Sequence, residues 1–401
     1  MVLTRRLLPA VLGCGVLLVG CSTGADPGSP ATGARSERVT SAPAPTPSPT
    51  SPPEPVTVTI VGAGDVLPHV PVVVNANRYA GGAAGEYDFA PMFAEVAPLL
   101  EEADVAICHL ETPLSADNTG LSRPRELVFN SPREVAAGVR SAGFDGCDFA
   151  SNHSWDQGRT GLAETIDVVE EAGLAYAGPQ AEESRAGEAA LFDVDGVTVA
   201  HLAYTYTLFN TWGPNTEVPP EAPWAGRAMW PVTQAEGIVS DARDARDARE
   251  AGADLVVLSM HWGEEYVAAP TQDQRTVARE ILESGTVDLI LGTHVHVIQP
   301  CEPIDGRTVF YGLGNFLSNQ APETSGGSLL PETQEGMIAR ATFTVDADGS
   351  VSSVVDYQPT RVDLDGHVIE PATPATHPQT HARTVAAVES LGPGACAASP
   401  R

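Results

Sequence analysis

Histidines and acidic residues follow short apolar runs at five places in this chain. In the last of them, residues 288–296 read DLILGTHVH, so that His294 and His296 are separated by one residue. Along an extended chain, alternate residues point to the same side, and we expect the two imidazoles to share a face. Two imidazoles that share a face at the end of a buried strand indicate half of a metal site.

Four other clusters have the same form. They are GDVLPH (64–69), CHLE (108–111), SNHSWDQG (151–158) and SMHWGEEY (259–266). If the five strand ends meet at one rim, their mixed oxygen and imidazole groups favour Mn²⁺, Fe or Zn²⁺ over Ca²⁺ or Mg²⁺ alone. Two such ions about 3.5–4 Å apart can activate a water and neutralise developing charge. We therefore expect a hydrolytic site with two divalent transition metal ions.

Several of these residues also have purely structural interpretations. Asp65 could cap a helix, an acid such as Glu111 at a strand end is often structural, and His261 alone would more often be a satisfied core residue. His69 is expected to face solvent in a loop. The acids Glu264 and Glu265 could support a ligand, contact a substrate or simply lie on the surface.

The most specific chemistry is expected around Asn152 and His153. An amide oxygen can bind a hard metal, and the adjacent imidazole can donate a proton to a leaving group. Asp156 could fix the tautomer of that imidazole, or could only cap the helix that follows. Serine–histidine–aspartate chemistry has little support, because the only GxSxG sequence, at 20–24, lies near the N-terminus and outside all five clusters.

The N-terminus predicts a secreted and lipid-anchored protein. Arg5 and Arg6 precede an apolar stretch at 7–19 that is too short to span a membrane. LVGC at 18–21 is typical of a lipoprotein cleavage site, with Cys21 as the lipidated residue. Ordinary secretion and an uncleaved anchor are the alternatives. The Pro/Ser/Thr-rich segment 22–55 cannot form a core and is expected to be a tether.

The charge of the chain restricts its partners. The formal net charge is −30, and all 22 basic residues are arginine. A strongly acidic surface argues against nucleic acid as a partner. Without lysine, the chain cannot use a Schiff base or a P-loop lysine. A solvated acidic coat is the simplest explanation of the charge.

Alternating strands and helices predict an α/β layered fold. Strands are expected at 56–63, 105–110, 146–151, 197–204, 255–260, 289–292 and 308–312, and helices at 91–102, 132–142, 158–172, 232–251 and 271–284. Ligands in such folds bind beyond the carboxyl ends of strands, where the histidine clusters lie.

The part of the chain after residue 316 is expected to be less regular. Segments 336–345 and 350–358 are expected to form a hairpin, within a domain of residues 56–365. Residues 366–401 are expected to form a tail with one helix at 381–391, and His367, His377 and His381 are interpreted as surface residues. Outside the cytoplasm Cys108, Cys147, Cys301 and Cys396 could pair, and Cys108 with Cys147 could equally be two buried thiols.

Ordered motifs between residue 56 and about residue 320 resemble a known family. They are GD (64–65), HLETPL (109–114), GFD (143–145), NH (152–153), DxG (156–158), HWGxEY (261–266), PTxxQR (270–275), HxHVxQP (294–300) and YxLGNF (311–316). This pattern resembles the CapA family of poly-γ-glutamate capsule biosynthesis proteins, within the calcineurin-like metallophosphoesterase superfamily.

The resemblance implies a four-layer αββα sandwich with a metal site at its strand ends. The implied metal ligands are Asp65, Glu111, Asn152, His261, His294 and His296. The implied catalytic residue is His153, supported by Asp156. Further candidates are Glu265, Asn315 and His109, the last of which stands where the family usually has asparagine.

The resemblance leaves three functions to distinguish. The first is a metal-dependent hydrolase outside the cytoplasm, which acts on a phosphoester or an amide of a cell-surface polymer. The second is a non-enzymatic, lipid-tethered factor of capsule or envelope assembly that binds the polymer or its synthase. The third is a generic phosphoesterase unrelated to capsule. Expected partners are the polymer or phosphoester substrate and, through the lipid anchor, the cell membrane.

Overall fold

Two β-sheets packed face to face form the centre of this protein. The computed structural model describes residues 54–210, 217–233, 243–392, 395–396 and 398–401, within a compact unit from Pro52 to Arg401. The predicted signal peptide, Cys21 and almost all of the predicted tether lie outside the described residues. Among the described helices, none is long and apolar enough to cross a membrane.

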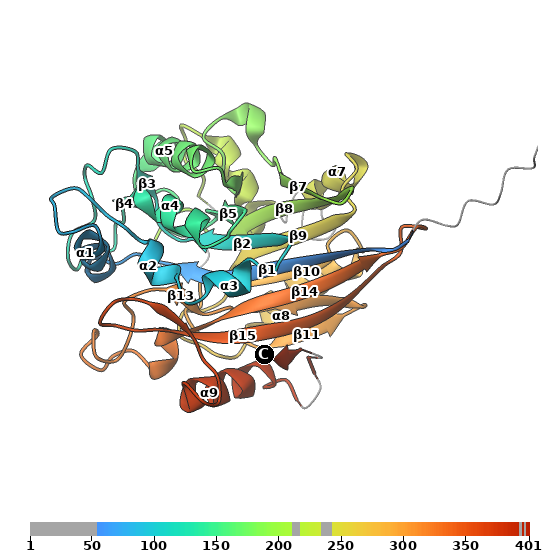
Figure 1. Cartoon of the computed structure of the whole chain (residues 1–401). Coiled ribbons are helices and arrows are strands. Elements are labelled where there is room, and N and C mark those ends of the chain that lie inside the picture. The colour runs from blue at the N-terminus through green and yellow to red at the C-terminus, as the bar shows by residue number, and fades with distance from the viewer. Residues whose placement is uncertain (1–53, 211–216, 234–242, 393–394, 397) are drawn as a thin grey trace, which may run out of the picture. The chain divides into compact units, whose positions relative to one another are not determined.

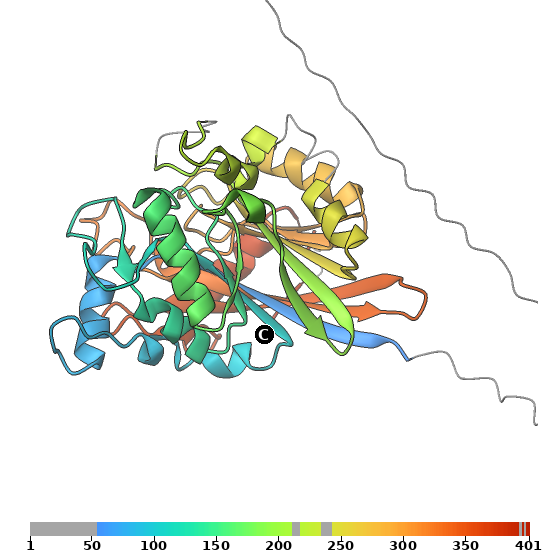
Figure 2. The same cartoon turned by 90° about the horizontal axis from the view of Figure 1, so that it is seen from above.

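The first sheet has the strand order β16-β15-β14-β1-β2-β5-β6, with β13 beside β1 and β17 beside β15. Its strands are β1 (Val56–Val66), β2 (Val105–Leu110), β5 (Gly146–Asp148), β6 (Ala175–Ala177), β13 (Asn315–Leu317), β14 (Glu335–Val345), β15 (Val351–Val362), β16 (Ile369–Pro371) and β17 (Ser399–Pro400). β1, β2, β5 and β6 run parallel. The expected hairpin is the long pair β14 and β15, which Figure 2 shows reaching one end of the unit.

The second sheet has the order β11-β12-β10-β9-β8-β7, and β8, β9, β10 and β12 are parallel. Its strands are β7 (Ala190–Val194), β8 (Val197–Thr205), β9 (Leu255–His261), β10 (Leu289–Thr293), β11 (Cys301–Ile304) and β12 (Arg307–Phe310). A separate short pair joins β3 (Leu114–Ser115) to β4 (Ser131–Pro132).

Helices cover the outer faces of both sheets (Figure 1). The helices are α1 (Val70–Tyr79), α2 (Ala90–Phe93), α3 (Ala97–Leu100), α4 (Glu134–Ser141), α5 (Gly158–Glu171), α6 (Trp230–Thr233), α7 (Arg243–Glu250), α8 (Gln272–Glu283) and α9 (Pro378–Val388), with 3-10 turns η1 (Glu183–Arg185), η2 (Pro223–Ala228) and η4 (Pro331–Gln334). α1 to α5 pack on the first sheet, and α7 and α8 pack on the second. These layers give the predicted αββα order.

Alternate residues of the central strands pack into two different cores, one between the sheets and one between a sheet and its helices. In β1, Val58 and Ile60 face the second sheet, whereas Val61 and Ala63 face the helices. Strands that are buried on both faces need apolar side chains at nearly every position. This requirement explains the continuous apolar runs in the sequence, and it leaves the strand ends as the places where polar side chains can gather.

Two predicted helices differ in the structure. The helix expected at 91–102 is two single turns, α2 and α3. Pro98 follows this break and has no N–H to donate to the preceding turn, which favours the interruption. The helix expected at 232–251 is α6 and α7, with the residues between them outside the described part.

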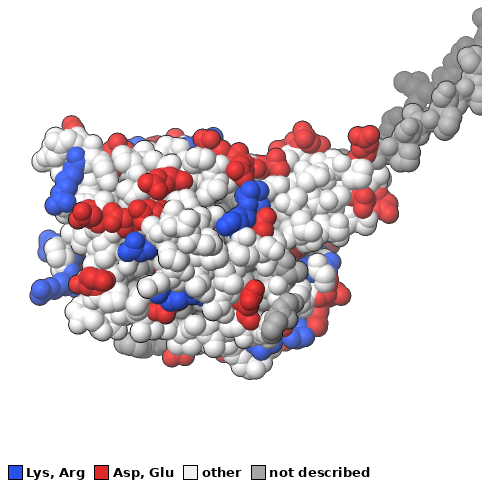
Figure 3. Space-filling view, turned by 60° about the horizontal axis from the view of Figure 1, so that its bottom comes forward, with Lys and Arg blue, Asp and Glu red and all other residues white. Residues whose placement is uncertain are grey.

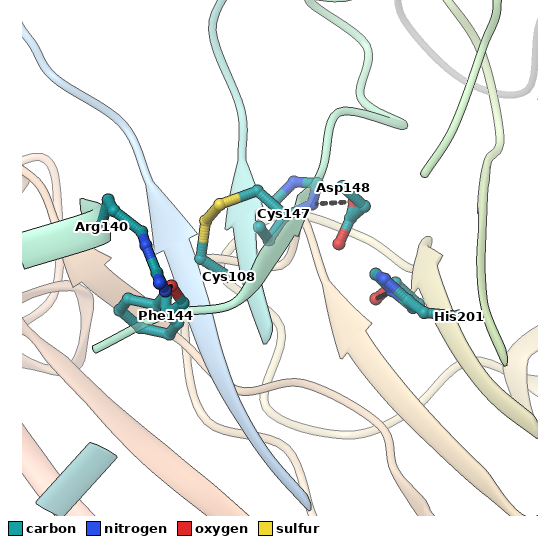
Figure 4. Close-up of a disulfide and its surroundings, with 8 residues drawn as sticks. Cys108, Arg140, Phe144, Cys147, Asp148 and His201 are labelled. Atoms are coloured by element: carbon teal, nitrogen blue, oxygen red, sulfur yellow. Dashed lines mark hydrogen bonds and ion pairs between the residues drawn. A yellow bond between two sulfur atoms is a disulfide. The ribbon is translucent and has the colours of Figure 1, made fainter. Parts of the chain in front are cut away.

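The C-terminal segment packs against the rest of the fold. β16 pairs with β15, α9 contacts β14 and β15, and a disulfide joins Cys396 to Cys301 on β11. The interpretation of His367 as a surface residue is wrong, because the side chain is 2% exposed and contacts the side chains of Asn75 and Asn319. The second disulfide joins Cys108 to Cys147 across β2 and β5, where the two residues are register partners (Figure 4).

Candidate metal centre

Strand register aligns four polar residues across the first sheet. Asp65 on β1 is the register partner of Asn315 on β13 and of His109 on β2, and His109 is in turn the partner of Asp148 on β5. Asp65 lies within β1, with the ladder irregular beside it, whereas α1 begins only at residue 70. Its alternative interpretation as a helix cap is therefore wrong.

The second sheet brings its own polar row to the same place. His261 ends β9 and is the register partner of Thr205 on β8 and Thr293 on β10. The His261 and His109 rings, one from each sheet, stack with centroids 4.9 Å apart. The predicted strand ends of the two sheets therefore meet at one buried rim.

Three overlapping groups of side chains could each hold a metal ion. They are Asp65, His109 and His261; Glu111, His261 and His294; and Asp65, Glu111 and His296. Within each group one ligand atom per residue lies within 4.8 Å of the others, and all of these residues are buried. Asp65, Glu111 and His261 each belong to two groups. Shared ligands of this kind are suited to two neighbouring cations.

His294 and His296 reach the rim by a different route from the one predicted. β10 ends at Thr293, and the φ angles of His294 and His296 are 87° and 57°, so the chain turns instead of continuing as a strand. The alternation argument is therefore wrong, although the two rings do lie near each other with centroids 6.2 Å apart. Positive φ in two non-glycine residues costs energy and is typical of functional sites.

Buried polar atoms that lack a hydrogen-bond partner indicate whether the site can hold metal ions. Within the described residues, His109 Nε2, His294 Nδ1 and both carboxylate oxygens of Glu111 have no hydrogen-bond partner. A buried polar atom without a partner costs about 1–3 kcal/mol, and a charged one costs more. Four such atoms on neighbouring ligands fit cations that would bind them.

Neighbouring groups fix the orientation of two of the imidazoles. His109 Nδ1 lies 2.6 Å from Asp148 Oδ1, which leaves Nε2 directed toward Asp65, 4.0 Å from Oδ1. His296 Nδ1 lies 3.0 Å from both Asp65 Oδ2 and Asn315 Oδ1, which leaves Nε2 3.5 Å from Glu111. Carboxylates and amides behind metal-bound histidines usually orient the ring in this way.

An amide and a hydroxyl hold the third imidazole. His261 Nδ1 lies 3.2 Å from Thr293 Oγ1, and Nε2 lies 3.0 Å from Asn152 Oδ1. Asn315 is held in turn, because its Nδ2 donates to Gln320 Oε1 and to the Thr333 carbonyl. Asn152 therefore presents its oxygen at the rim, as predicted for an amide ligand, and Asn315 supports His296 from behind.

Burial and close charges shift the pKa values of the cluster. Burial lowers the pKa of His261 and of His294 well below the usual range, so both are neutral and able to bind a cation. Burial raises the pKa of Glu111 to about 7. Burial acts against the charged form of His109, but Asp148 outweighs it and raises the pKa to about 9. Glu111 and Asp65 similarly raise the pKa of His296 to about 10 against burial.

His153 lies at the edge of the site and is paired with Asp156. Its Nδ1 is 2.8 Å from Asp156 Oδ2, and that oxygen also accepts the Phe129 backbone N–H at 2.6 Å. The cap of α5 is Gln157, without a side-chain cap hydrogen bond, so Asp156 does not serve as the cap. Asp156 instead leaves His153 Nε2 free to act. His69 is partly buried and not a freely solvated loop residue, because its ring lies against Phe129.

Several residues at the site were not identified from the sequence. The Tyr206 ring lies tilted against the His294 ring with centroids 4.6 Å apart, and Asp148 and Thr293 support His109 and His261. His201 is buried beside Ser259, 2.9 Å from its hydroxyl, and Figure 4 shows it facing Asp148. The available signal was an acidic residue, Asp148, inside the apolar run that was expected to be a strand at 146–151. Glu265 is exposed and was predicted only as an ambiguous candidate.

The paired sheets and their rim of carboxylates, imidazoles and amides define an αββα sandwich with a candidate metal-binding rim. The family model described as "Bacterial capsule synthesis protein PGA_cap" matches residues 59–320. The chain belongs to this family of bacterial capsule synthesis proteins.

Relatives with curated names agree with this membership. The chain is 31% identical over 231 residues to "Capsule biosynthesis protein CapA" of Bacillus anthracis, covering 57% of this chain and 54% of that protein. It is 27% identical over 230 residues to "PGA biosynthesis protein CapA" of Bacillus subtilis strain 168, covering 57% of each. The chain thus spans a little over half the length of these two relatives.

Solved structures of phosphoesterases show a more distant similarity. A phosphatase from Mycoplasma pneumoniae has a TM-score of 0.40 at 16% identity, covering 76% of this chain and 94% of that one. The calcineurin-like phosphoesterase YfkN of Bacillus subtilis has a TM-score of 0.41 at 15% identity, covering 82% and 98%.

Proposed function

We propose that this protein is a metal-dependent hydrolase of the cell surface, which cleaves a phosphoester or an amide during the synthesis or processing of a capsule polymer. The observation that carries the proposal is the set of overlapping ligand groups, in which His109 Nε2, His294 Nδ1 and both carboxylate oxygens of Glu111 have no hydrogen-bond partner among the described residues. Membership of the capsule synthesis family supports the link to capsule.

Two divalent cations, Mn, Fe or Zn, would be held by Asp65, Glu111, Asn152, His261, His294 and His296, with His109 as an additional ligand. When bound, they would supply positive charge for an attacked phosphoryl or carbonyl oxygen and lower the pKa of water. The chain's own contribution is to hold these ligands in a buried rim, where electrostatic interactions are stronger than in water.

His153 is positioned to move a proton. Asp156 holds its Nδ1, and His153 Nε2 can donate a proton to the leaving oxygen or nitrogen. A positioned general acid of this kind contributes about 10²–10⁴-fold in rate. Phe129 packs its ring edge-on with His153 at 4.7 Å and restricts the imidazole further.

The proposed location is the outer face of the cell membrane, with Cys21 as the lipid attachment site. The two disulfides support this location, since such bonds form and persist in oxidising compartments. The proposed partners are the polymer or phosphoester substrate and the membrane.

Metal analysis combined with a hydrolysis assay tests the function. Asp65→Ala and His294→Ala should each lower bound transition metal well below stoichiometric levels. Asp193→Ala, at an exposed position on β7, and His381→Ala on α9 should leave the metal content unchanged. Wild-type protein should hydrolyse a chromogenic phosphodiester or an amide-linked polymer, and a chelator should stop the reaction.

Two outcomes of this experiment, and a third that is combined with deletion of the gene, would separate the hypotheses. Unchanged metal content in both site variants would overturn the metal centre. Bound metal without hydrolysis of either substrate class would instead favour the lipid-tethered assembly factor. Hydrolysis of the phosphodiester alone, with no effect of gene deletion on capsule, would favour a generic phosphoesterase.

A further inference from the structure

Most described arginine side chains pair with a carboxylate. Arg133, for example, pairs with Glu171, and Arg185 pairs with Glu170 and Glu188. Within the described residues, Arg78, Arg123 and Arg125 form no ion pair, although the chain has 52 acidic residues to 22 basic ones. On the face shown in Figure 3, charged patches of both signs are scattered over a mostly uncharged surface.

These three arginines line the same groove. Its volume is about 610 Å³, and its walls are α1, the loop 116–130 and residues 364–367. Glu126 and Asp365 also line the groove, but neither lies within ion-pair distance of an arginine. The groove therefore holds three guanidinium groups against two carboxylates, in a chain whose net charge is −30.

Ring contacts connect the groove to the candidate metal centre. His69 and Phe129 both line it, with ring centroids 5.7 Å apart, and Phe129 contacts the ring of His153. The ring of Phe129 therefore separates a ligand in the groove from His153, the residue that we propose to be the proton donor.

Hydrogen bonds hold the arginine-bearing loop to the site. Asp156 accepts the Phe129 N–H, and Gln157 Nε2 donates to the Phe129 carbonyl at 2.8 Å. Asn210 Nδ2 donates to the Leu127 carbonyl, and Asn210 Oδ1 accepts from Asn152 Nδ2, each at 3.3 Å. Arg125 itself has a φ of 70°, a conformation that a bulky residue rarely adopts.

The chemistry of the groove points to an anionic ligand. Guanidinium groups bind carboxylates and phosphates through paired hydrogen bonds. An acidic protein repels anions in general, so arginines without a carboxylate partner near the candidate metal centre give such a ligand a local site. Arg78 Nη1 donates to Asn75 Oδ1 at 2.8 Å, which holds this guanidinium in place without neutralising its charge. Val74 and Leu127 line the same groove and are 45% and 64% exposed, which provides apolar contact for carbon segments between charges.

We infer that this groove binds an anionic segment with at least two carboxylate or phosphate groups, next to the bond that is cleaved at the metal centre. Binding itself depends only on the groove, whereas the position next to a cleaved bond rests on the proposed function. Arg78 would contact one end of the segment from α1, and Arg123 and Arg125 would contact it from the loop.

Direct binding to the full-length protein tests the inference. The probes are pentaglutamate, inorganic tripolyphosphate and neutral pentaglutamine, titrated calorimetrically with and without a chelator. The triple variant Arg78→Gln, Arg123→Gln, Arg125→Gln should bind the favoured anion at least about tenfold more weakly, since it loses the charged hydrogen bonds of three guanidinium groups.

A second triple variant serves as the matched control. Arg185→Gln, Arg279→Gln and Arg361→Gln remove the same charge from arginines that pair with carboxylates elsewhere, and affinity should stay within about twofold. Tighter binding of pentaglutamate would show that the groove prefers carboxylates, and tighter binding of tripolyphosphate would show that it prefers phosphates.

The chelator separates this inference from the proposed function. Anion binding that persists with chelator but is lost in the groove variant supports the groove, even if no hydrolysis is found. Equal losses in the two triple variants, tight binding of pentaglutamine, or binding that disappears with chelator but survives in the groove variant would each overturn the inference.

Discussion

Single side chains at the rim are oriented by hydrogen bonds to neighbouring carboxylate and amide oxygens. Asp148 and Asn315 each take a hydrogen from an imidazole Nδ1, so that His109 and His296 direct Nε2 inward. A neutral imidazole binds metal through the nitrogen that carries no hydrogen. The tautomers of the cluster are therefore set by neighbouring residues, and they should change when those neighbours change.

His153→Ala should keep its bound metal and lose hydrolysis by about a hundredfold or more, because His153 is assigned to proton transfer. Asp156→Asn should lose less activity and should also shift the pH profile, because it changes the tautomer and the loop contact at Phe129. Elemental analysis and steady-state kinetics measure both effects. Turnover in His153→Ala equal to that of the wild type would remove the assigned role.

Metal affinity should rise as the pH rises from about 6 to about 8. In the metal-free protein, burial raises the pKa of Glu111 to about 7, so the group is protonated below that pH and a cation must displace the proton. His109 and His296, with pKa values of about 9 and about 10, also release protons when they bind metal. Calorimetry in two buffers of different ionisation enthalpy counts the released protons, and a count of zero would contradict the prediction.

At the scale of elements, strand register decides which polar residues become neighbours. Asp65, His109 and Asp148 come from segments up to 83 positions apart, yet adjacent parallel strands place them in one row. The Cys108–Cys147 disulfide lies one position before His109 and Asp148 and fixes the same pair of strands. The position of His109 should therefore depend on this bond.

Replacing Cys108 and Cys147 with alanine should lower the free energy of unfolding by about 4 kcal/mol, the chain-entropy value for a loop of this size. The same change should weaken metal binding, because β2 and β5 can shift. Replacing Cys301 and Cys396 with alanine should lower the free energy of unfolding by about 5 kcal/mol and leave metal affinity unchanged. Urea unfolding measures the loss of stability in each double variant, and metal titration measures the change in metal affinity. An equal loss of metal affinity in the two double variants would contradict the dependence of His109 on the Cys108–Cys147 bond.

Part of this arrangement was predictable from the sequence. Runs such as 255–260 and 289–292 gave strands close to their observed limits, because a strand buried on both faces must be continuously apolar. The motifs also predicted Asp65, His261 and the pair His294 and His296 as site residues, and the structure brings these side chains together. The turn that carries the last two was not predictable, since positive φ in histidine has no local sequence signal.

At the scale of the whole molecule, the net charge of −30 determines which charged ligands the protein attracts or repels. This field repels anionic ligands, except where arginines lack a carboxylate partner. The groove beside His153 provides such a place, and the candidate metal centre would provide another. Both lie at the carboxyl ends of parallel strands, the usual position of binding sites in α/β folds.

Cys21→Ser should release the protein from the membrane fraction, because the motif LVGC at 18–21 predicts lipidation at that cysteine. The anchor acts on the whole molecule, so the released form should keep its metal content. Fractionation of cells with detection of the protein in each fraction measures the change. Continued sedimentation of the variant with membranes would show that Cys21 is not the anchor.

The sequence by itself determined which residue types follow each strand, the layered α/β class and the family. Those features depend on local apolar pattern and on short motifs. Only the tertiary structure decided that the imidazoles of His109 and His261 stack across two sheets, which cysteines pair, and which arginines are left without a carboxylate. These outcomes depend on how distant segments pack, and no local pattern specifies the distance between them.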